Sequence, residues 1–158
     1  MSSLEKFNNS ISNLSWTITT LPSEAKMFNS GDNSYSPVSD TIFNYKLPYS
    51  NTTSVIELLS VDGQLVLTTK FNGNTFKHWL NSLYEGLHIP INSDSLSIDQ
   101  MASIYTMASY FRQKEDRIHI IEKLENNILK PYELLGDRVF FEGHLNRKNN
   151  VWTYFLGS

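Results

Sequence analysis

The sequence predicts one α+β domain over residues 1–158, with three central helices flanked by an N-terminal β-hairpin region and a C-terminal β-hairpin. Apolar residues recur at helical spacing in the middle of the chain, and β-branched and aromatic runs bounded by turn residues lie on both sides of it. A length of 158 residues fits one domain, and no linker-like stretch divides the chain. We therefore expect an N-terminal part (1–40), a core (41–135) and a C-terminal hairpin (136–158).

The N-terminal part begins with a predicted amphipathic helix. Its apolar residues follow one another at spacings of three, four and three: Leu4, Phe7, Ile11 and Leu14. Asn and Ser are weak helix formers, so this helix is expected to need a partner surface. Trp16 and Ile18 then predict a short strand. Residues 22–40 are rich in Ser, Asn, Asp, Gly and Pro, and predict a long polar loop.

The segment 41–70 predicts a β-hairpin followed by an element that could be either a strand or a helix. Residues 41–47 alternate between apolar and polar, and 55–59 form a second β-rich run. The SNTT sequence at 50–53 supplies turn residues between them. At 64–70 the neighbouring threonines favour a strand, whereas a family resemblance described below favours a helix, and both interpretations stay open.

Three helices are predicted at 74–86, 97–112 and 115–129. The apolar faces of the second and third helices include Ile98, Tyr105 and Ile118. We expect the helices to enclose a core that contains Phe76, Leu80, Leu83, Met101, Ile104, Ala108, Ile121 and Leu124.

Capping residues mark the ends of these helices. Asn74 is a predicted N-cap and Gly86 a predicted C-terminal cap of the first helix. Ser97 and Gln100 have the spacing of a capping box at the start of the second.

The C-terminal part predicts a hairpin. Residues 138–145 and 151–156 are β-rich runs, and the NRKNN sequence between them suits an exposed turn.

Composition excludes several classes of function. The chain has no Cys, which excludes disulfide scaffolds, thiolate metal sites and cysteine nucleophiles. A net charge of −3 gives no general footprint for nucleic acid, and no apolar run is long enough to span a bilayer. The first residues lack the profile of a signal peptide, so the expected setting is intracellular or a virion.

The sequence predicts no catalytic site, no cofactor and no metal. Phosphate-loop, dinucleotide and nucleophile-elbow motifs are absent from it. Its four histidines, at 78, 88, 119 and 144, lack ligand spacing. Its carboxylate pairs, Glu115–Asp116 and Glu122/Glu125, lie among charged or polar residues that would not raise a pKa for acid catalysis. We therefore expect a protein that is not an enzyme.

Aromatic residues of the C-terminal hairpin are the candidate partner-binding residues. Trp152, Tyr154 and Phe155 are of the types enriched at interface hot spots. The N-terminal helix would dock on a second subunit through its apolar side chains, Leu4, Phe7 and Ile11. The alternative is that all these side chains close the domain's own core, and the sequence leaves the two open.

Residues 41–112 resemble a family of contractile-tailed bacteriophage proteins known as baseplate hub assembly proteins or chaperones. The family has a strand ending in Leu-Pro, a turn, a second strand and a Val-x-x-Gln-x-x-Leu helix start. The matching residues are Leu47–Pro48, Ser50–Asn51, Val55, Ile56, Val61, Gln64 and Leu67, and then Ser97–Asp99, Tyr105, Ser109 and Arg112 in a later helix. The resemblance implies a structural or assembly protein of a viral tail, with tail or baseplate proteins as partners and a homo- or hetero-oligomeric state.

A second resemblance is to BTB/POZ domains. The sequence FKHWLNSLYEG, residues 76–86, is similar to a helix of that family, and Met107–Phe111 is similar to a later one. Pro48 lies where a preceding helix of that family would run. This resemblance implies a protein-interaction adaptor.

Overall fold

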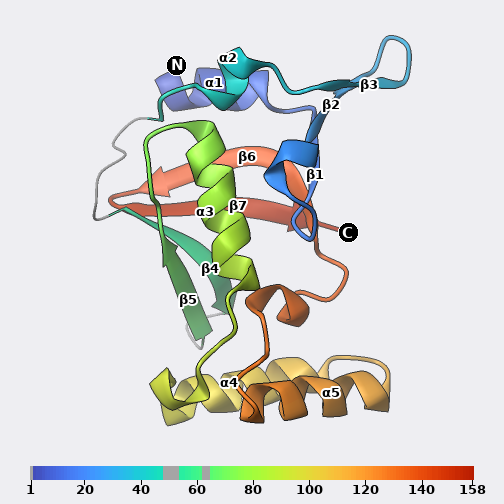
Figure 1. Cartoon of the computed structure of the whole chain (residues 1–158), viewed down its shortest axis with the longest axis vertical. Helices are drawn as coiled ribbons and strands as arrows, with labels where there is room; N and C mark the ends of the chain where they lie inside the picture. Colours follow the sequence, from blue (N-terminus) through green and yellow to red (C-terminus); the bar gives the residue numbers. More distant parts are fainter. Residues whose placement is uncertain (1, 48–53, 62–64) are drawn as a thin grey trace.

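A computed structural model describes residues 2–47, 54–61 and 65–158, which form one seven-stranded sheet with helices around it (Figure 1). The strand order is β3-β2-β1-β6-β7-β4-β5. Neighbours in it are antiparallel, except that β4 runs parallel to β7. The strands are β1 (Leu14–Thr17), β2 (Lys26–Asn29), β3 (Ser34–Pro37), β4 (Val55–Val61), β5 (Leu65–Lys70), β6 (Phe140–Lys148) and β7 (Val151–Gly157).

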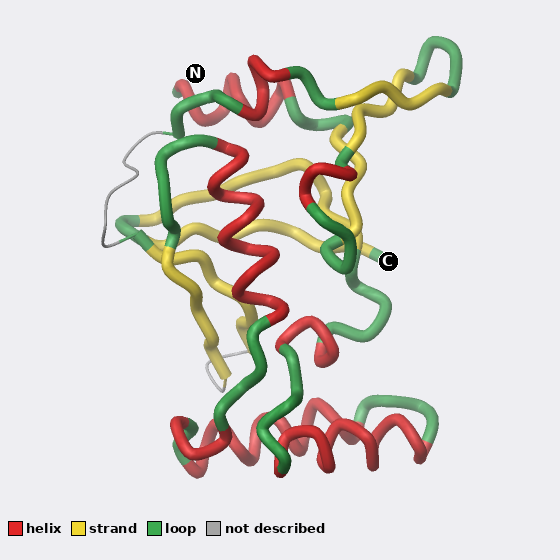
Figure 2. Tube along the Cα trace, in the orientation of Figure 1, coloured by secondary structure: helices red, strands yellow, loops and turns green. Residues whose placement is uncertain are grey.

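The helices lie in three places around the sheet (Figure 2). Helix α3 packs on one face, against β4 and β5, while α1 and α2 lie at one end of the molecule and the α4–α5 pair at the other. The α-helices are α1 (Ser3–Ser10), α2 (Asp40–Phe43), α3 (Phe76–His88), α4 (Ile98–Ser109) and α5 (Lys114–Glu125), and the short 3-10 helices are η1 (Pro22–Glu24), η2 (Ser93–Ser95) and η3 (Pro131–Leu134).

Helix α1 begins at a capping box between Ser2 and Glu5, which satisfies backbone donors of its first turn. Asn8 fixes the helix to the sheet. Its amide nitrogen donates to the Leu145 carbonyl oxygen at 2.7 Å, and its amide oxygen accepts from the Leu145 N–H at 2.8 Å. The predicted helix is confirmed over Ser3–Ser10, and its partner surface is strand β6. The predicted strand is confirmed at Trp16, but Leu14, expected on the helix, begins this strand, and Ile18 lies just beyond it.

The prediction of a polar loop over 22–40 is wrong. The segment contains η1 and the β2–β3 hairpin, which extends the sheet beyond β1. Short-range hydrogen bonds explain why a polar segment is ordered here. Asp32 accepts from the N–H and hydroxyl of Ser34 at the hairpin turn, and these bonds lower the pKa of the Asp32 carboxyl.

The hairpin predicted from 41–47 and 55–59 is also wrong. Ser39 caps the short helix α2, and Lys46 makes only an isolated bridge to Thr75. Strand β4 pairs instead with β5, so the open question at 64–70 is answered as a strand from Leu65 onward. The turn predicted at 50–53 lies outside the described residues.

Helix α3 is confirmed, with two corrections at its ends. Its N-cap is Thr75, whose hydroxyl accepts from the His78 N–H at 3.2 Å, and not Asn74. Gly86 lies inside the helix rather than at its C-terminal cap, because the helix ends at His88. A Cβ at Gly86 would lie 2.6 Å from the Thr69 Cβ, so glycine lets α3 approach β5 closely.

Helix α4 begins at the predicted capping box of Ser97 and Gln100. The α4–α5 pair buries fewer apolar residues than predicted. Ile98 is 88% exposed, and Tyr105 and Ile118 are exposed as well. In α5 it is Ile120, not Ile121, that is buried.

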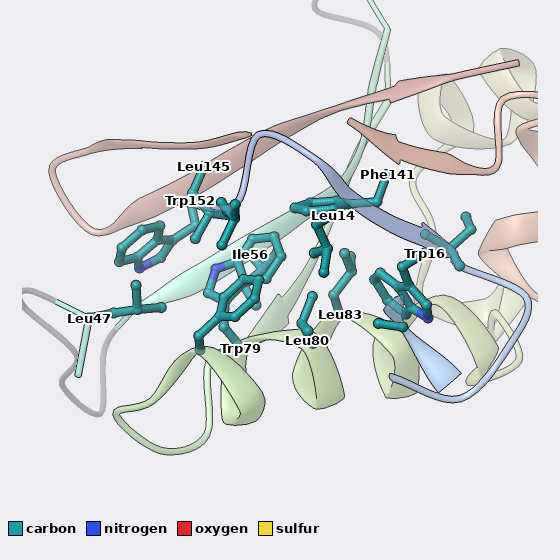
Figure 3. Close-up of a cluster of buried hydrophobic side chains, with 14 of the residues drawn as sticks. Leu14, Trp16, Leu47, Ile56, Trp79, Leu80, Leu83, Phe141, Leu145 and Trp152 are labelled. Atoms are coloured by element: carbon teal, nitrogen blue, oxygen red, sulfur yellow. The ribbon is translucent and has the colours of Figure 1, made fainter. Parts of the chain in front are cut away.

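Two clusters of buried side chains hold the fold together. The larger one lies between α1, α3 and the sheet, and Figure 3 shows its side chains, with Trp79, Leu80 and Leu83 of α3 facing the sheet. The smaller one joins α4 and α5 to β4, β5 and η3. Six of the predicted core residues are buried, and two are half-buried: Met101 and Ile121. Among the described residues, none of the helices is long and apolar enough to cross a bilayer.

Candidate binding groove

Strands β4 and β7 start side by side and then separate. Their parallel ladder has two residue pairs, Val55 with Val151 and Ile56 with Trp152, and the Val55 N–H also donates to the Asn150 carbonyl oxygen at 2.9 Å. Beyond these pairs the two strands diverge, β7 toward the C-terminus and β4 toward the α4–α5 pair (Figure 1).

A groove of about 640 Å³ lies between the diverging strands. Its two walls are residues 57–60 of β4 and 153–156 of β7. The α4 and η3 regions complete it with Met107, Tyr110, Leu134, Leu135 and Arg138. The volume lies within the range of roughly 300–1,000 Å³ that is typical of ligand-binding sites in proteins.

Backbone groups of β7 face this groove. Strands β6 and β7 pair as Lys148 with Val151 across the Asn149–Asn150 turn, so Val151 directs its backbone N–H and C=O toward β6. By alternation, the N–H and C=O of Tyr154 and Leu156 point away from β6. Within the described part of the chain, no strand pairs with β7 on that side beyond Trp152.

Tyr154 forms part of the groove and is held by the core. Its ring packs edge-on against Trp79 with a centroid separation of 5.6 Å, and its hydroxyl lies 3.5 Å from the Leu58 carbonyl oxygen across the groove. Burial, assisted by the nearby Glu57 carboxylate, raises the pKa of the Tyr154 phenol above its usual range. The phenol proton is directed at the Leu58 carbonyl oxygen and so links β7 to β4.

The rim of the groove carries exposed rings and two charges. Phe155 is 58% exposed and Tyr110 is 80% exposed. Glu57 is half-buried and Arg138 is exposed, and neither makes an ion pair with another residue that the structure describes. A groove with apolar walls, free backbone groups and a few charges is suited to binding a polypeptide.

The three predicted anchor residues of the C-terminal hairpin differ in their burial. Trp152 is fully buried, with its ring edge-on to Phe71 and Trp79 at 6.0 and 6.4 Å. Tyr154 is half-buried, and Phe155 alone is exposed. Trp152 thus lies in the domain's own core, and partner contact through Phe155 stays a prediction.

The predicted anchors of the N-terminal helix lie mostly in the core as well. Phe7 and Ile11 are buried, and Leu4 is half-buried against the same cluster. Phe7 stacks on Tyr45 at 4.3 Å. Phe7 and Ile11 would reach a second subunit only if the helix left the sheet.

The four histidines are spread over three elements: His78 and His88 lie on α3, His119 on α5 and His144 on β6. His88 is the last residue of α3, and its ring lies 4.0 and 4.7 Å from those of Tyr84 and Tyr132. No group of three or more His, Asp or Glu side chains in the described ranges is arranged to hold a metal ion.

Comparisons of the chain with protein-family models, curated proteins and solved structures give no match.

Sequence reasoning missed the groove because it assigned β4 to the wrong partner. With β4 paired to 41–47, the parallel contact of β4 with β7 could not be foreseen. The short β-rich runs at 55–59 and 151–156 are the only signal in the sequence, and neither carries information about where two strands separate.

Proposed function

We propose that this protein is a non-enzymatic structural or assembly protein that acts by binding other proteins through the groove between β4 and β7. The observation that carries the proposal is the juxtaposition, at one place, of unpaired strand edges and exposed rings on both sides of a 640 Å³ groove. Exposed aromatic side chains at the rim of an apolar groove are typical of protein interfaces.

We propose further that the partners are tail or baseplate proteins of a contractile-tailed bacteriophage. The support for this context is the local sequence resemblance over 41–112. The corresponding location is a virion, or the host cytoplasm during assembly. Of the segment in which the resemblance implies a helix start, Val61 belongs to β4, and Leu65 and Leu67 belong to β5. The groove, and not this segment, therefore supports the binding role.

Co-purification tests the proposal. The tagged full-length chain, expressed during infection, is expected to retain tail or baseplate proteins. Phe155→Lys should reduce this retention, whereas Ile128→Lys, a similarly exposed position outside the groove, should not. Retention of tail proteins by both variants alike would contradict a role for the groove. A cullin-type scaffold, or a stable self-dimer through α1, would instead support the BTB/POZ-like adaptor.

A further inference from the structure

We propose that the ligand of the groove is an extended segment of a partner protein, which pairs as an additional strand between β4 and β7 and places an acidic side chain beside Arg138. The inference rests on the proposed binding role of the groove, and adds the conformation and charge of what is bound.

The backbone of β7 favours an extended ligand. Tyr154 and Leu156 present N–H and C=O groups toward the groove, and the ladder that would satisfy them ends at Trp152. Extended polypeptide offers donors and acceptors along both of its edges, at the spacing that a strand edge requires. A helix satisfies its own backbone and could not pair with these groups. The free edges therefore select an extended segment.

The two faces of the groove differ in their exposure to solvent. On its inner side lie the buried or half-buried side chains of Leu58, Leu134 and Leu135. On its outer side lie Thr153 and the exposed ring of Phe155. Side chains of an extended segment point alternately to opposite sides. Apolar residues at every second position of the ligand would thus face the inner side, with polar residues between them.

The two charged side chains that line the groove, Glu57 and Arg138, lie at its opposite ends. Glu57 follows Ile56, the last residue of β4 that pairs with β7, so its carboxylate is at the narrow end. Arg138 lies two residues before Phe140, which pairs with Gly157 at the end of β7, so its guanidinium is at the wide end. An acidic side chain of the ligand is therefore favoured at the wide end, and a carboxylate is disfavoured at the narrow end.

A random library of ten-residue peptides, presented to the full-length chain, tests this inference. The enriched sequences are expected to alternate apolar and polar residues and to carry Asp or Glu at one end. A synthetic copy of an enriched peptide should bind wild-type protein, and Arg138→Glu should weaken that binding by about tenfold or more, since a charge-assisted hydrogen bond is replaced by repulsion. Arg112→Glu, an exposed arginine outside the groove, is the matched control and should change affinity by less than about twofold.

N-methylation of the peptide distinguishes backbone pairing from binding through side chains alone. Methyl groups on central amides remove donors that a strand needs, so they should lower affinity by about tenfold or more. The inference is overturned if N-methylated peptides bind as well as the parent, if Arg138→Glu binds like Arg112→Glu, or if no sequence is enriched. Retention of tail proteins that still depends on Phe155 would then leave the proposed function standing while the strand-pairing inference fails.

Self-association is a further outcome that would contradict the inference. If the wild-type chain forms a dimer in sedimentation that Phe155→Lys dissociates, a second copy and not a partner segment occupies the groove.

Discussion

Trp152 and Phe155 lie on the same strand of the C-terminal hairpin but have different roles. Its ring is fully buried and contacts Phe71 and Trp79, whereas the ring of Phe155 on the same strand is 58% exposed. Both are large aromatic residues in one β-rich run, and composition cannot tell which side of the strand meets the core. Because successive side chains of a strand point to opposite faces, the burial of Trp152 puts Phe155, three residues later, on the face away from the core.

Trp152→Ala is expected to destabilise the isolated chain by about 3–5 kcal/mol, because it removes a fully buried aromatic side chain and leaves a cavity. Phe155→Ala should change the free energy of unfolding by less than about 0.5 kcal/mol, since most of its ring is already in water. Urea denaturation measures both. Equal, small losses would place Trp152 outside the core.

Asn8 is a second residue whose role the sequence does not reveal. Its amide makes two hydrogen bonds to the backbone of Leu145 and replaces a neighbouring strand at that point of β6. In the sequence it is one of 16 asparagines, most of which suit turns and loops. Only the tertiary contact distinguishes it from the others.

Asn8→Ala should cost about 2–4 kcal/mol, because it leaves a buried N–H and a buried C=O of Leu145 without partners. Lys6→Ala, at an exposed position of the same helix, serves as the control and should cost less than about 0.5 kcal/mol. Thermal or urea unfolding of the two variants checks this expectation. If the two lose the same stability, the Asn8 contacts do not hold α1 on the sheet.

At the scale of elements, helices were more predictable than strand pairings. The stripe and capping box of α4 are local patterns, as are the apolar residues of α3, and the structure contains both helices. Strand pairing depends on contacts distant in sequence, such as β4 with β7 or β1 with β6. The C-terminal hairpin is the exception because its two strands are joined by a two-residue turn.

The close contact between α3 and β5 predicts that replacing a helical glycine by alanine destabilises the protein, opposite to the usual effect of this substitution. In an exposed helix, Gly→Ala stabilises by about 1 kcal/mol through propensity. At Gly86 the new methyl group would lie 2.6 Å from the Thr69 Cβ, so Gly86→Ala should instead destabilise by about 1–3 kcal/mol. Gly31→Ala, where nothing lies within 4 Å, is the matched control and should stay within about 0.5 kcal/mol of wild type. A stabilised Gly86→Ala protein would refute the close packing of α3 on β5.

At the scale of the whole molecule, the two buried clusters are joined through shared strands. Leu59 of β4 and Leu65 of β5 belong to the smaller cluster, while Ile56 and Leu58 of β4 belong to the larger one. Leu67 packs against both. The α4–α5 pair should therefore unfold together with the sheet and not as a separate unit.

Tryptophan fluorescence tests this coupling, because the chain's three tryptophans, Trp16, Trp79 and Trp152, all lie in the larger cluster. Ile104→Ala removes a buried side chain of the smaller cluster and should cost about 2–5 kcal/mol. Leu80→Ala, in the larger cluster, should cost a similar amount. Both variants are expected to lower the urea midpoint seen by fluorescence and by circular dichroism equally. If Ile104→Ala leaves the fluorescence midpoint unchanged, the α4–α5 pair unfolds independently.

Strands β4 and β7 separate after two residue pairs and, within the described residues, leave strand edges free for a ligand. Amide hydrogen exchange, resolved by residue in the full chain, tests it most directly. The Val55 N–H, which donates to the Asn150 carbonyl oxygen, is expected to be protected, whereas the Tyr154 and Leu156 amides should exchange at least about tenfold faster. Protection of Tyr154 and Leu156 equal to that of Val55 would contradict the claim, because it would mean that these amides are already paired in the free protein.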